Sequence, residues 1–229
     1  MELFDSHRVL YEDNHLLIVN KLPSEIVQGD KTGDQPLSEI LKFYLKEKYQ
    51  KPGNVFVGVV HRLDRPVSGV VIFAKTGKAL SRLNEMLRDH VIKKKYWAVV
   101  KNCPPEASGH LVHYLKKNEK QNKSYACTQA EAGYLKAELR YRVIGQSNNY
   151  FLLEVELLTG RHHQIRVQLS EIGCPIKGDL KYGYPRSNPK GSIHLHAREV
   201  AFIHPVKQTP VNCLANPPAD PVWDALTNR

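Results

Sequence analysis

The chain has few cysteines and no long apolar segment, and each shortage excludes a class of protein. Its four cysteines are scattered through 229 residues without a C-x-x-C pair. This favours reduced thiols in a cytoplasmic protein over a disulfide framework or a structural zinc site. No apolar run approaches the ~18 residues that are needed to cross a bilayer, so no membrane partner is expected. The opening residues MELFDSHR lack the basic and apolar regions of a signal peptide.

Glycine and proline occur in ordinary amounts, at 14 residues each, which excludes a collagen-like or low-complexity fibre. Hydrophobic residues make up 41% of the chain, which is enough to build a packed core. Basic residues outnumber acidic residues by 33 to 23, so the net charge is +10. Such an excess serves either solubility or the binding of a nucleic acid, and charge alone does not separate the two.

Apolar periodicity predicts alternating strands and helices. Strands are predicted at residues 16–19, 55–60, 70–74, 96–100, 137–144 and 150–158, the last two paired around a turn. Helices are predicted from Pro36, after a cap at Thr76, and over residues 160–172, with Gly173 as the stop. Regular strand–helix–strand crossovers are few, so we expect an α+β fold with a mixed, largely antiparallel central sheet flanked by helices and loops.

A charged segment, HRLDRPVSG at residues 61–69, lies between two apolar runs. Its carboxylate, Asp64, is flanked by Arg62 and Arg65, and nearby cations favour the ionised form. An ionised and well-positioned carboxylate can act as a nucleophile. The residues alone leave a second interpretation open, in which Asp64 caps a turn and pairs with a neighbouring arginine.

This segment resembles the signature H-R-L-D-x-x-T-S-G of the RluA family of pseudouridine synthases. Further blocks follow in the family's order between residues 16 and 205: Asn20-Lys21, the K-x-Y element Lys94-Lys95-Tyr96, TGRHHQIRVQL from Thr159, GCPIKGD from Gly173, LHA from Leu195 and FIHP from Phe202. One block would be a weak signal, whereas several in order are highly specific. The resemblance implies the catalytic fold of pseudouridine synthases.

The chain departs from the family pattern at four positions. Pro66 and Val67 replace a polar residue and the usual threonine, which changes the hydrogen bonds available near Asp64, although Pro66 stiffens the loop. Gln168 stands where the family often has histidine, and His162 where it often has serine or threonine. Some relatives carry an S4-like RNA-binding domain in front, whereas this chain starts directly with the catalytic blocks. We therefore expect a single catalytic domain over residues 1–229 that recognises RNA by itself.

The resemblance implies an isomerase that converts specific uridines to pseudouridine in structured RNA, either large-subunit ribosomal RNA or transfer RNA. The reaction breaks the bond from C1′ to N1, turns the base, and joins C1′ to C5. Because nothing is oxidised and no group is added, no cofactor and no metal are expected. We expect the protein to act as a monomer.

By the resemblance, the catalytic residues are Asp64, Tyr96 and Arg166. Asp64 is the nucleophile or the initiating base, and attack at C1′, attack at C6 and removal of the 2′ proton all stay open. Arg166 is expected to pair with Asp64 in a desolvated site. Tyr96 offers a ring to stack on the target base and a phenol near the carbon that loses its proton.

The target nucleotide must leave its stack to reach Asp64, and basic side chains are expected to hold the RNA while it does so. The expected RNA-binding residues are Arg62, Arg65, Lys93, Lys94, Lys95, Arg161 and Gln164. Residues 93–95 could instead be a solvated charge run. The polar stretch 113–128, with Lys116, Lys117, Lys120 and Lys123, has the same two interpretations.

Two rival functions also fit parts of the sequence. A non-catalytic RNA-binding relative would keep the basic charge but would have no use for Asp64, Tyr96 and Arg166 together. A hydrolase could pair Asp64 with His61, yet no glycine-rich oxyanion turn or metal set accompanies them. The histidine pairs at 162–163 and 194/196 are expected to be structural, because adjacent histidines on a helix do not easily share one metal.

Overall fold

The computed structural model describes residues 4–227, which divide into two compact units. The first unit takes the residues up to 93 together with residues 197–216, and the second takes residues 94–196 together with those from 217 onward. Most strand pairs are antiparallel, and four α-helices accompany them in the described part of the chain, so the α+β expectation is confirmed. That residues 1–229 act as one domain stays a prediction, and its first three and last two residues lie outside the described range.

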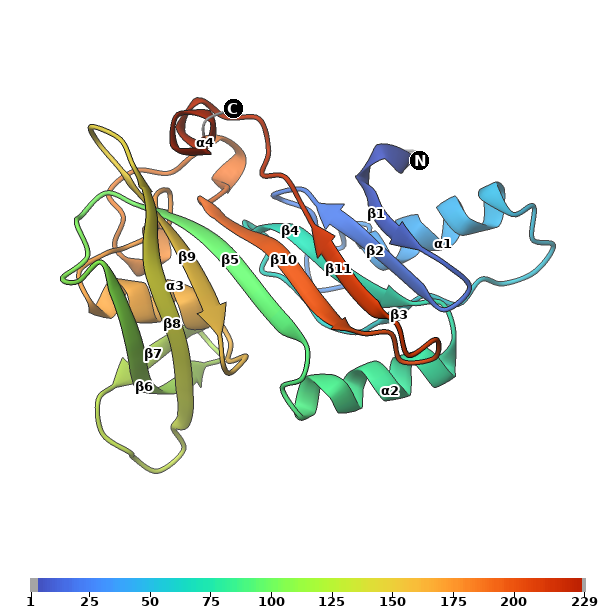
Figure 1. Ribbon diagram of the computed structural model, residues 1–229, viewed down its shortest axis with the longest axis horizontal. Helices are drawn as coiled ribbons and strands as arrows, with labels where there is room; N and C mark the ends of the chain where they lie inside the picture. The colour runs from blue at the N-terminus through green and yellow to red at the C-terminus, as the bar shows by residue number, and fades with distance from the viewer. Residues whose placement is uncertain (1–3, 228–229) are drawn as a thin grey trace. The chain divides into compact units, whose positions relative to one another are not determined.

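The first unit is built on a sheet in the order β1-β2-β4-β10-β11, with a short β3 also paired to β4. Its strands are β1 (Val9–Glu12), β2 (Leu16–Lys21), β3 (Gly58–Val59), β4 (Ser68–Ala74), β10 (Leu195–Ile203) and β11 (Pro210–Leu214). Its helices are α1 (Leu37–Lys48) and α2 (Gly77–Arg88). Figure 1 shows β1 beside β2 and β11 beside β10.

The apolar stripe of α2 closes a core over this sheet. Ala79 and Leu83 of the helix are buried with Ile18 of β2 and Ile72 of β4. The helix begins as predicted, because the Thr76 hydroxyl accepts the Ala79 N–H at 3.2 Å. The strands predicted at 16–19 and 70–74 and the helix predicted after Pro36 are also confirmed.

The strand predicted at residues 55–60 is mostly wrong, since β3 covers only Gly58 and Val59. These two residues pair with Ala74 and Phe73 of β4. The next N–H along β4 belongs to Ile72, and it donates to the imidazole Nε2 of His61 at 3.1 Å. A side chain therefore takes the place of a third strand residue and ends the pairing.

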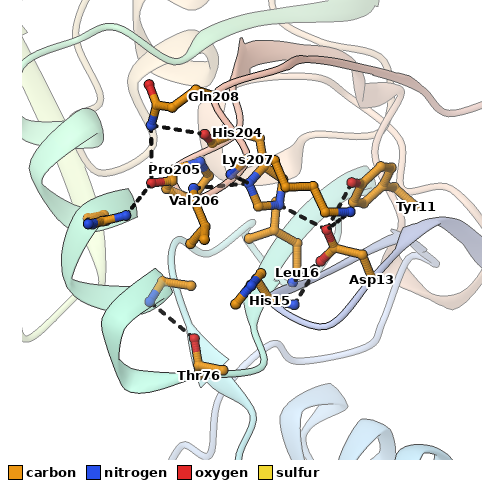
Figure 2. Close-up of polar contacts among 12 residues, drawn as sticks. Tyr11, Asp13, His15, Leu16, Thr76, His204, Pro205, Val206, Lys207 and Gln208 are labelled. Carbon is orange, nitrogen blue, oxygen red and sulfur yellow. Dashed lines mark hydrogen bonds and ion pairs between the residues drawn. The ribbon is translucent and has the colours of Figure 1, made fainter.

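Buried His204 fastens two turns of the first unit together (Figure 2). Its Nδ1 accepts the N–H groups of Val206 and Lys207 at 3.0 and 2.9 Å, so the proton lies on Nε2, which donates to Asp13 at 3.0 Å. Asp13 lies in the turn between β1 and β2 and also pairs with the Lys207 ammonium at 2.7 Å. The histidine of the FIHP block thus has a structural role.

The second unit contains a sheet in the order β5-β9-β8-β6-β7. Its strands are β5 (Lys93–Val100), β6 (Ser108–Asn118), β7 (Lys123–Cys127), β8 (Leu135–Gln146) and β9 (Phe151–Leu157). It also holds helices α3 (Gln164–Glu171) and α4 (Pro221–Thr227) and the 3-10 turn η2 (Leu180–Tyr182). The predicted pairing of residues 137–144 with 150–158 is confirmed as β8 and β9.

The helix predicted over residues 160–172 is confirmed only from Gln164. His163 has a left-handed conformation, with φ 56°, which interrupts the helical backbone just before Gln164. The helix ends at Glu171, and Gly173 follows it with φ 75°, as expected for a stop. In the part of the chain that is described, no helix is long and apolar enough to cross a membrane.

Candidate active site

In the first unit, Asp64 lies on a turn that is closed by main-chain hydrogen bonds. The Val67 N–H donates to the Asp64 carbonyl at 3.0 Å, and the Ser24 N–H donates to the Arg65 carbonyl at 2.9 Å. Gly69 follows with φ 116°, and a Cβ there would overlap the backbone of Ala197 on β10. Only glycine therefore lets β4 start this close to β10 after the turn.

A buried lysine anchors this turn from within. The Lys21 ammonium, at the end of β2, donates to the carbonyls of Leu22, Arg65 and Val67 at 3.0, 3.2 and 2.6 Å. Burial lowers the Lys21 pKa to about 7, although the negative charges of Glu25 and Asp64 oppose this shift. Two of the three carbonyls belong to residues one and three positions after Asp64, so Lys21 fixes the backbone that carries the carboxylate.

These contacts explain how the loop tolerates its departures from the family pattern. Val67 is 2% exposed, and the loop is anchored through its carbonyl oxygen, which any residue would supply. The loss of a hydroxyl at this position therefore leaves the contact to Lys21 intact. Sequence reasoning included Lys21 in the Asn20-Lys21 block but assigned it no role.

The hydrolase alternative required His61 as a base for Asp64. Nε2 of this imidazole instead accepts the Ile72 N–H of β4. The lone pair of this nitrogen thus accepts a hydrogen bond from a strand, and proton abstraction through Nε2 would break that hydrogen bond. The geometry counts against this alternative.

The two arginines that flank Asp64 are both exposed. Arg65 forms an ion pair with Asp34, which lies on the loop before α1. An exposed ion pair of this kind contributes at most about 1 kcal/mol to stability, so a phosphate could replace Asp34 at little cost. The contacts of Arg62 and Arg65 with RNA remain predictions.

In the second unit, Arg166 is held by two neighbours. Its Nε and one Nη donate to the two carboxylate oxygens of Asp179 at 2.7 and 2.9 Å. Arg166 is 5% exposed and Asp179 1% exposed. The Arg166 guanidinium carbon also lies 5.1 Å from the centre of the Tyr182 ring. A bidentate pair and an aromatic face together fix the plane of the guanidinium.

Sequence reasoning missed Asp179, the buried partner of Arg166. It ends the GCPIKGD block, which was recognised without any role for its carboxylate. The preceding residue, Gly178, has φ 88°, and a Cβ there would lie 2.8 Å from the Ser192 carbonyl oxygen. Only glycine fits this close turn, so the Gly-Asp pair was the available signal.

Tyr96 lies on β5, opposite Val155 of β9, and is 7% exposed. The three lysines before it differ in environment: Lys93 is exposed, whereas Lys94 and Lys95 are half-buried. Burial lowers the Lys94 pKa. Of the three, Lys93 is the most accessible to a phosphate, and contacts of all three with RNA remain a prediction.

Gln164 braces the loop that leads into α3. Its amide oxygen accepts the Thr159 hydroxyl at 2.8 Å and the Arg161 N–H at 2.9 Å, while its Nε2 donates to the Glu138 carbonyl at 2.9 Å. The Arg161 guanidinium donates to the Lys136 carbonyl at 3.0 Å. Gln164 is 3% exposed, so the structure assigns it the positioning of the loop, and an RNA contact stays a prediction.

The adjacent histidines have structural contacts. His163 shares a 2.8 Å hydrogen bond with the Tyr182 hydroxyl through its Nδ1. Burial lowers the His163 pKa to about 2, and the charge of Arg166 adds to the shift. His162 stacks on His163 with 3.7 Å between ring centres. Within residues 4–227, no group of three or more His, Cys, Asp or Glu side chains could hold a metal.

Comparison with known proteins identifies the class. Residues 15–171 match the RNA pseudouridylate synthase family. The chain therefore belongs to this family of enzymes, which isomerise uridine to pseudouridine in RNA.

Individual relatives agree with this assignment. The chain is 33% identical to ribosomal large subunit pseudouridine synthase D of Zymomonas mobilis, over 93% of this chain and 69% of the relative. It is 36% identical to ribosomal large subunit pseudouridine synthase C of Buchnera aphidicola, over 87% of this chain and 63% of the relative. The chain thus spans about two thirds of the length of these relatives.

A solved structure supports the fold. Human RNA pseudouridylate synthase domain containing 4 is similar with a TM-score of 0.79, covering 95% of this chain and 91% of that one. The sequence identity is 23%, so this likeness concerns the fold alone. It agrees with the predicted pseudouridine synthase fold.

Proposed function

We propose that this chain itself isomerises specific uridines to pseudouridine in structured RNA, with large-subunit ribosomal RNA or transfer RNA as substrate. The observation that carries the proposal is Asp64, placed in the family's H-R-L-D block on a turn that Lys21 and Ser24 hold by the main chain. A carboxylate on such a turn can meet a substrate in a fixed geometry. The names of two relatives, which specify the ribosomal large subunit, favour ribosomal RNA.

The reaction needs no net exchange of groups. The bond from C1′ to N1 breaks, the base turns, the bond from C1′ to C5 forms, and the C5 hydrogen leaves as a proton while N1 gains one. Asp64 begins this sequence as a nucleophile at C1′ or C6, or as a base that removes the 2′ proton. Nothing in the sequence requires a cofactor or a metal.

In this proposal, Arg166 pairs with Asp64, and its orientation comes from Asp179 and Tyr182. Pairing offsets the cost of removing the carboxylate from water when RNA closes the site. Tyr96 stacks on the target base and accepts or relays the proton that C5 loses.

Lys21 acts as a positioning residue in the same proposal. It touches neither the substrate nor the carboxylate's reacting oxygen, and it acts through the carbonyls of Arg65 and Val67. Its loss should therefore affect the turnover of bound RNA more than the binding of RNA.

The RNA is held by Arg62, Arg65, Lys93, Lys94, Lys95, Arg161 and Gln164. Arg62 fills the gap that the extruded base leaves or binds the backbone beside it. Arg65 exchanges its partner Asp34 for a phosphate. In this proposal the protein acts in the cytoplasm as a monomer.

The test uses unmodified transcripts of large-subunit ribosomal RNA and of transfer RNA, incubated with the protein and no added metal or nucleotide. After digestion to nucleosides, chromatography should show pseudouridine at the expense of uridine. A folded protein that binds both RNAs and converts neither would favour the non-catalytic relative. Mapping pseudouridines in cells with and without the gene would then identify the uridine.

A further inference from the structure

The β6–β7 hairpin of the second unit is fastened to the side of that unit that carries Arg166. The Ser124 N–H of β7 donates to the Tyr182 hydroxyl at 2.9 Å, and the Ser124 hydroxyl donates to the His162 carbonyl at 2.7 Å. The Lys181 ammonium donates to the Asn122 carbonyl in the hairpin turn at 2.9 Å. The hairpin is therefore joined at three points to residues close to Arg166 in the fold.

The ring of His162 adds to these contacts. His162 stands where the family often has serine or threonine, and its ring bonds Ser124 Oγ at 2.8 Å and Asn122 Oδ1 at 3.1 Å. A serine or threonine at this position could not reach both. The departure at His162 thus strengthens the attachment of the hairpin.

Several cations lie where the β6–β7 hairpin meets the side of the second unit that carries Arg166. The Lys123 ammonium lies 5.3 Å from the centre of the Tyr182 ring, and the Arg166 guanidinium carbon lies 5.1 Å from the same centre. The charges of Lys181 and Lys117 contribute, after burial and nearer charges, to the lowered pKa of His163. All of these cations therefore act on one small region.

Two of these cations have known carboxylate partners. Asp179 is committed to Arg166, and Glu119 pairs with Lys117 at 2.6 Å but is 78% exposed. Lys123 makes no ion pair within residues 4–227. Positive charge that is only partly balanced attracts an anion, and a phosphate can replace an exposed carboxylate.

We propose that Lys117, Lys123 and Lys181 form a basic rim that binds the phosphates of the substrate RNA beside the target nucleotide. The proposal rests on the proposed function, because only an RNA substrate bound at Arg166 would bring phosphates to these lysines. The register places Lys117 on the same face of the hairpin as Ser124, whereas Lys116 and Lys136 lie on the opposite face, because side chains alternate along a strand. Lys123, opposite Asn118, starts from that opposite face, yet its ammonium lies 5.3 Å from the centre of the Tyr182 ring. An acidic protein surface is the competing partner.

The test compares a rim variant with a charge-matched control. The rim variant carries Lys117→Gln and Lys123→Gln, which spares Lys181 and its bond to the hairpin turn. The control carries Lys46→Gln and Lys78→Gln, two exposed lysines on helices of the first unit. Both variants lose the same charge, so a general electrostatic effect would appear equally in both.

Binding is measured with a labelled transcript that the wild type converts, over a series of salt concentrations. The rim variant should bind about tenfold more weakly near 0.1 M salt, and the slope of log affinity against log salt should shrink by ~1.4–1.8, or ~0.7–0.9 for each lost phosphate contact. The control should change affinity by less than about twofold. The control should also convert the transcript at a single-turnover rate within about twofold of the wild type.

A second variant, His162→Ser, restores a residue type that is usual in the family. It should loosen the hairpin and weaken binding by about threefold while the salt slope stays unchanged, because no lysine is lost. The proposal that the rim binds RNA would be wrong if the slope of log affinity against log salt were equal for the rim variant, the control and an active wild type. Loss of binding to polyglutamate with RNA affinity unchanged would assign the rim to an acidic protein. A wild type that binds RNA without conversion would refute the proposed function instead.

Discussion

Asp64 and Arg166 are held in different ways. The turn that carries Asp64 is fixed by main-chain groups, through the Lys21 ammonium on two carbonyls and the bond from the Val67 N–H to the Asp64 carbonyl. Arg166 is fixed by side chains, through a bidentate bond to Asp179 and the ring of Tyr182. The Asp64 side chain makes none of these main-chain hydrogen bonds, whereas the Arg166 side chain is half of its anchor.

This difference predicts where activity and stability separate. A change of the Asp64 side chain leaves every named anchor of its turn in place, so the fold should hardly respond. A change of Arg166 leaves Asp179 buried without its counterion, so stability and activity should fall together. The following variants test this contrast, from the largest expected effect to the smallest.

Arg166→Met should lower the single-turnover rate ~10²–10³-fold or more and the free energy of unfolding by ~3–5 kcal/mol, because a buried charge loses its partner. Rates come from quenched conversion of RNA, and stability comes from denaturant unfolding. Adding Asp179→Leu to Arg166→Met removes the carboxylate that has lost its counterion. The double variant should regain most of the stability but no activity. If Arg166→Met were as stable as the wild type, the ion pair would not be the anchor that we describe.

Lys21→Met should lower kcat about 10–100-fold with KM nearly unchanged, because the turn loses its anchor while the RNA contacts remain. The free energy of unfolding should change by less than ~2 kcal/mol, since the lost hydrogen bonds are offset by relief from burying a charge. Hydrogen exchange of the Val67 amide should accelerate. A rise in KM at constant kcat would assign Lys21 to RNA binding instead of positioning.

His163 makes the Arg166 region sensitive to acid. Its folded pKa of about 2 lies below the ordinary histidine value, so the unfolded chain takes up the proton first. This contribution to stability is complete above pH ~6.5 and is lost as the pH falls, by up to ~1.4 kcal/mol for each pH unit. The wild type should therefore lose about 1 kcal/mol between pH 6.5 and 5.5.

His163→Asn is the matched control, because asparagine also tolerates the left-handed conformation at this position. Its unfolding free energy should depend less on pH over that range than that of the wild type. Parallel curves for the two proteins would mean that other buried histidines, such as His194 and His204, account for the acid sensitivity.

The sequence predicted most of the framework but not the supports of the site. Apolar periodicity located β2, β4 and α1, because each buries its own regular pattern. It overextended the strand before His61, where a side chain ends the pairing, and the helix after Gly160, where His163 adopts a left-handed conformation. Both errors come from single residues whose effect depends on their surroundings.

The candidate site shows the same limit. The blocks that contain Asp64, Tyr96 and Arg166 were visible in the sequence because they match family motifs. Lys21 and Asp179 were visible only as letters in such blocks, since their roles depend on which carbonyl or guanidinium the fold brings to them. Contacts between segments that are 13 to 46 residues apart carry no local signal in one sequence.

Release of tritium from C5 of uridine tests the central claim, that the Asp64 carboxylate starts the isomerisation on a turn held by main-chain hydrogen bonds. RNA with tritium at C5 should release it to water on incubation with the wild type alone, and the chain length of the RNA should not change. Asp64→Asn should unfold within ~0.5 kcal/mol of the wild type, bind RNA equally well, and release no tritium. Release by Asp64→Asn at the wild-type rate, or no release by a folded wild type from any of the tested RNAs, would contradict the account.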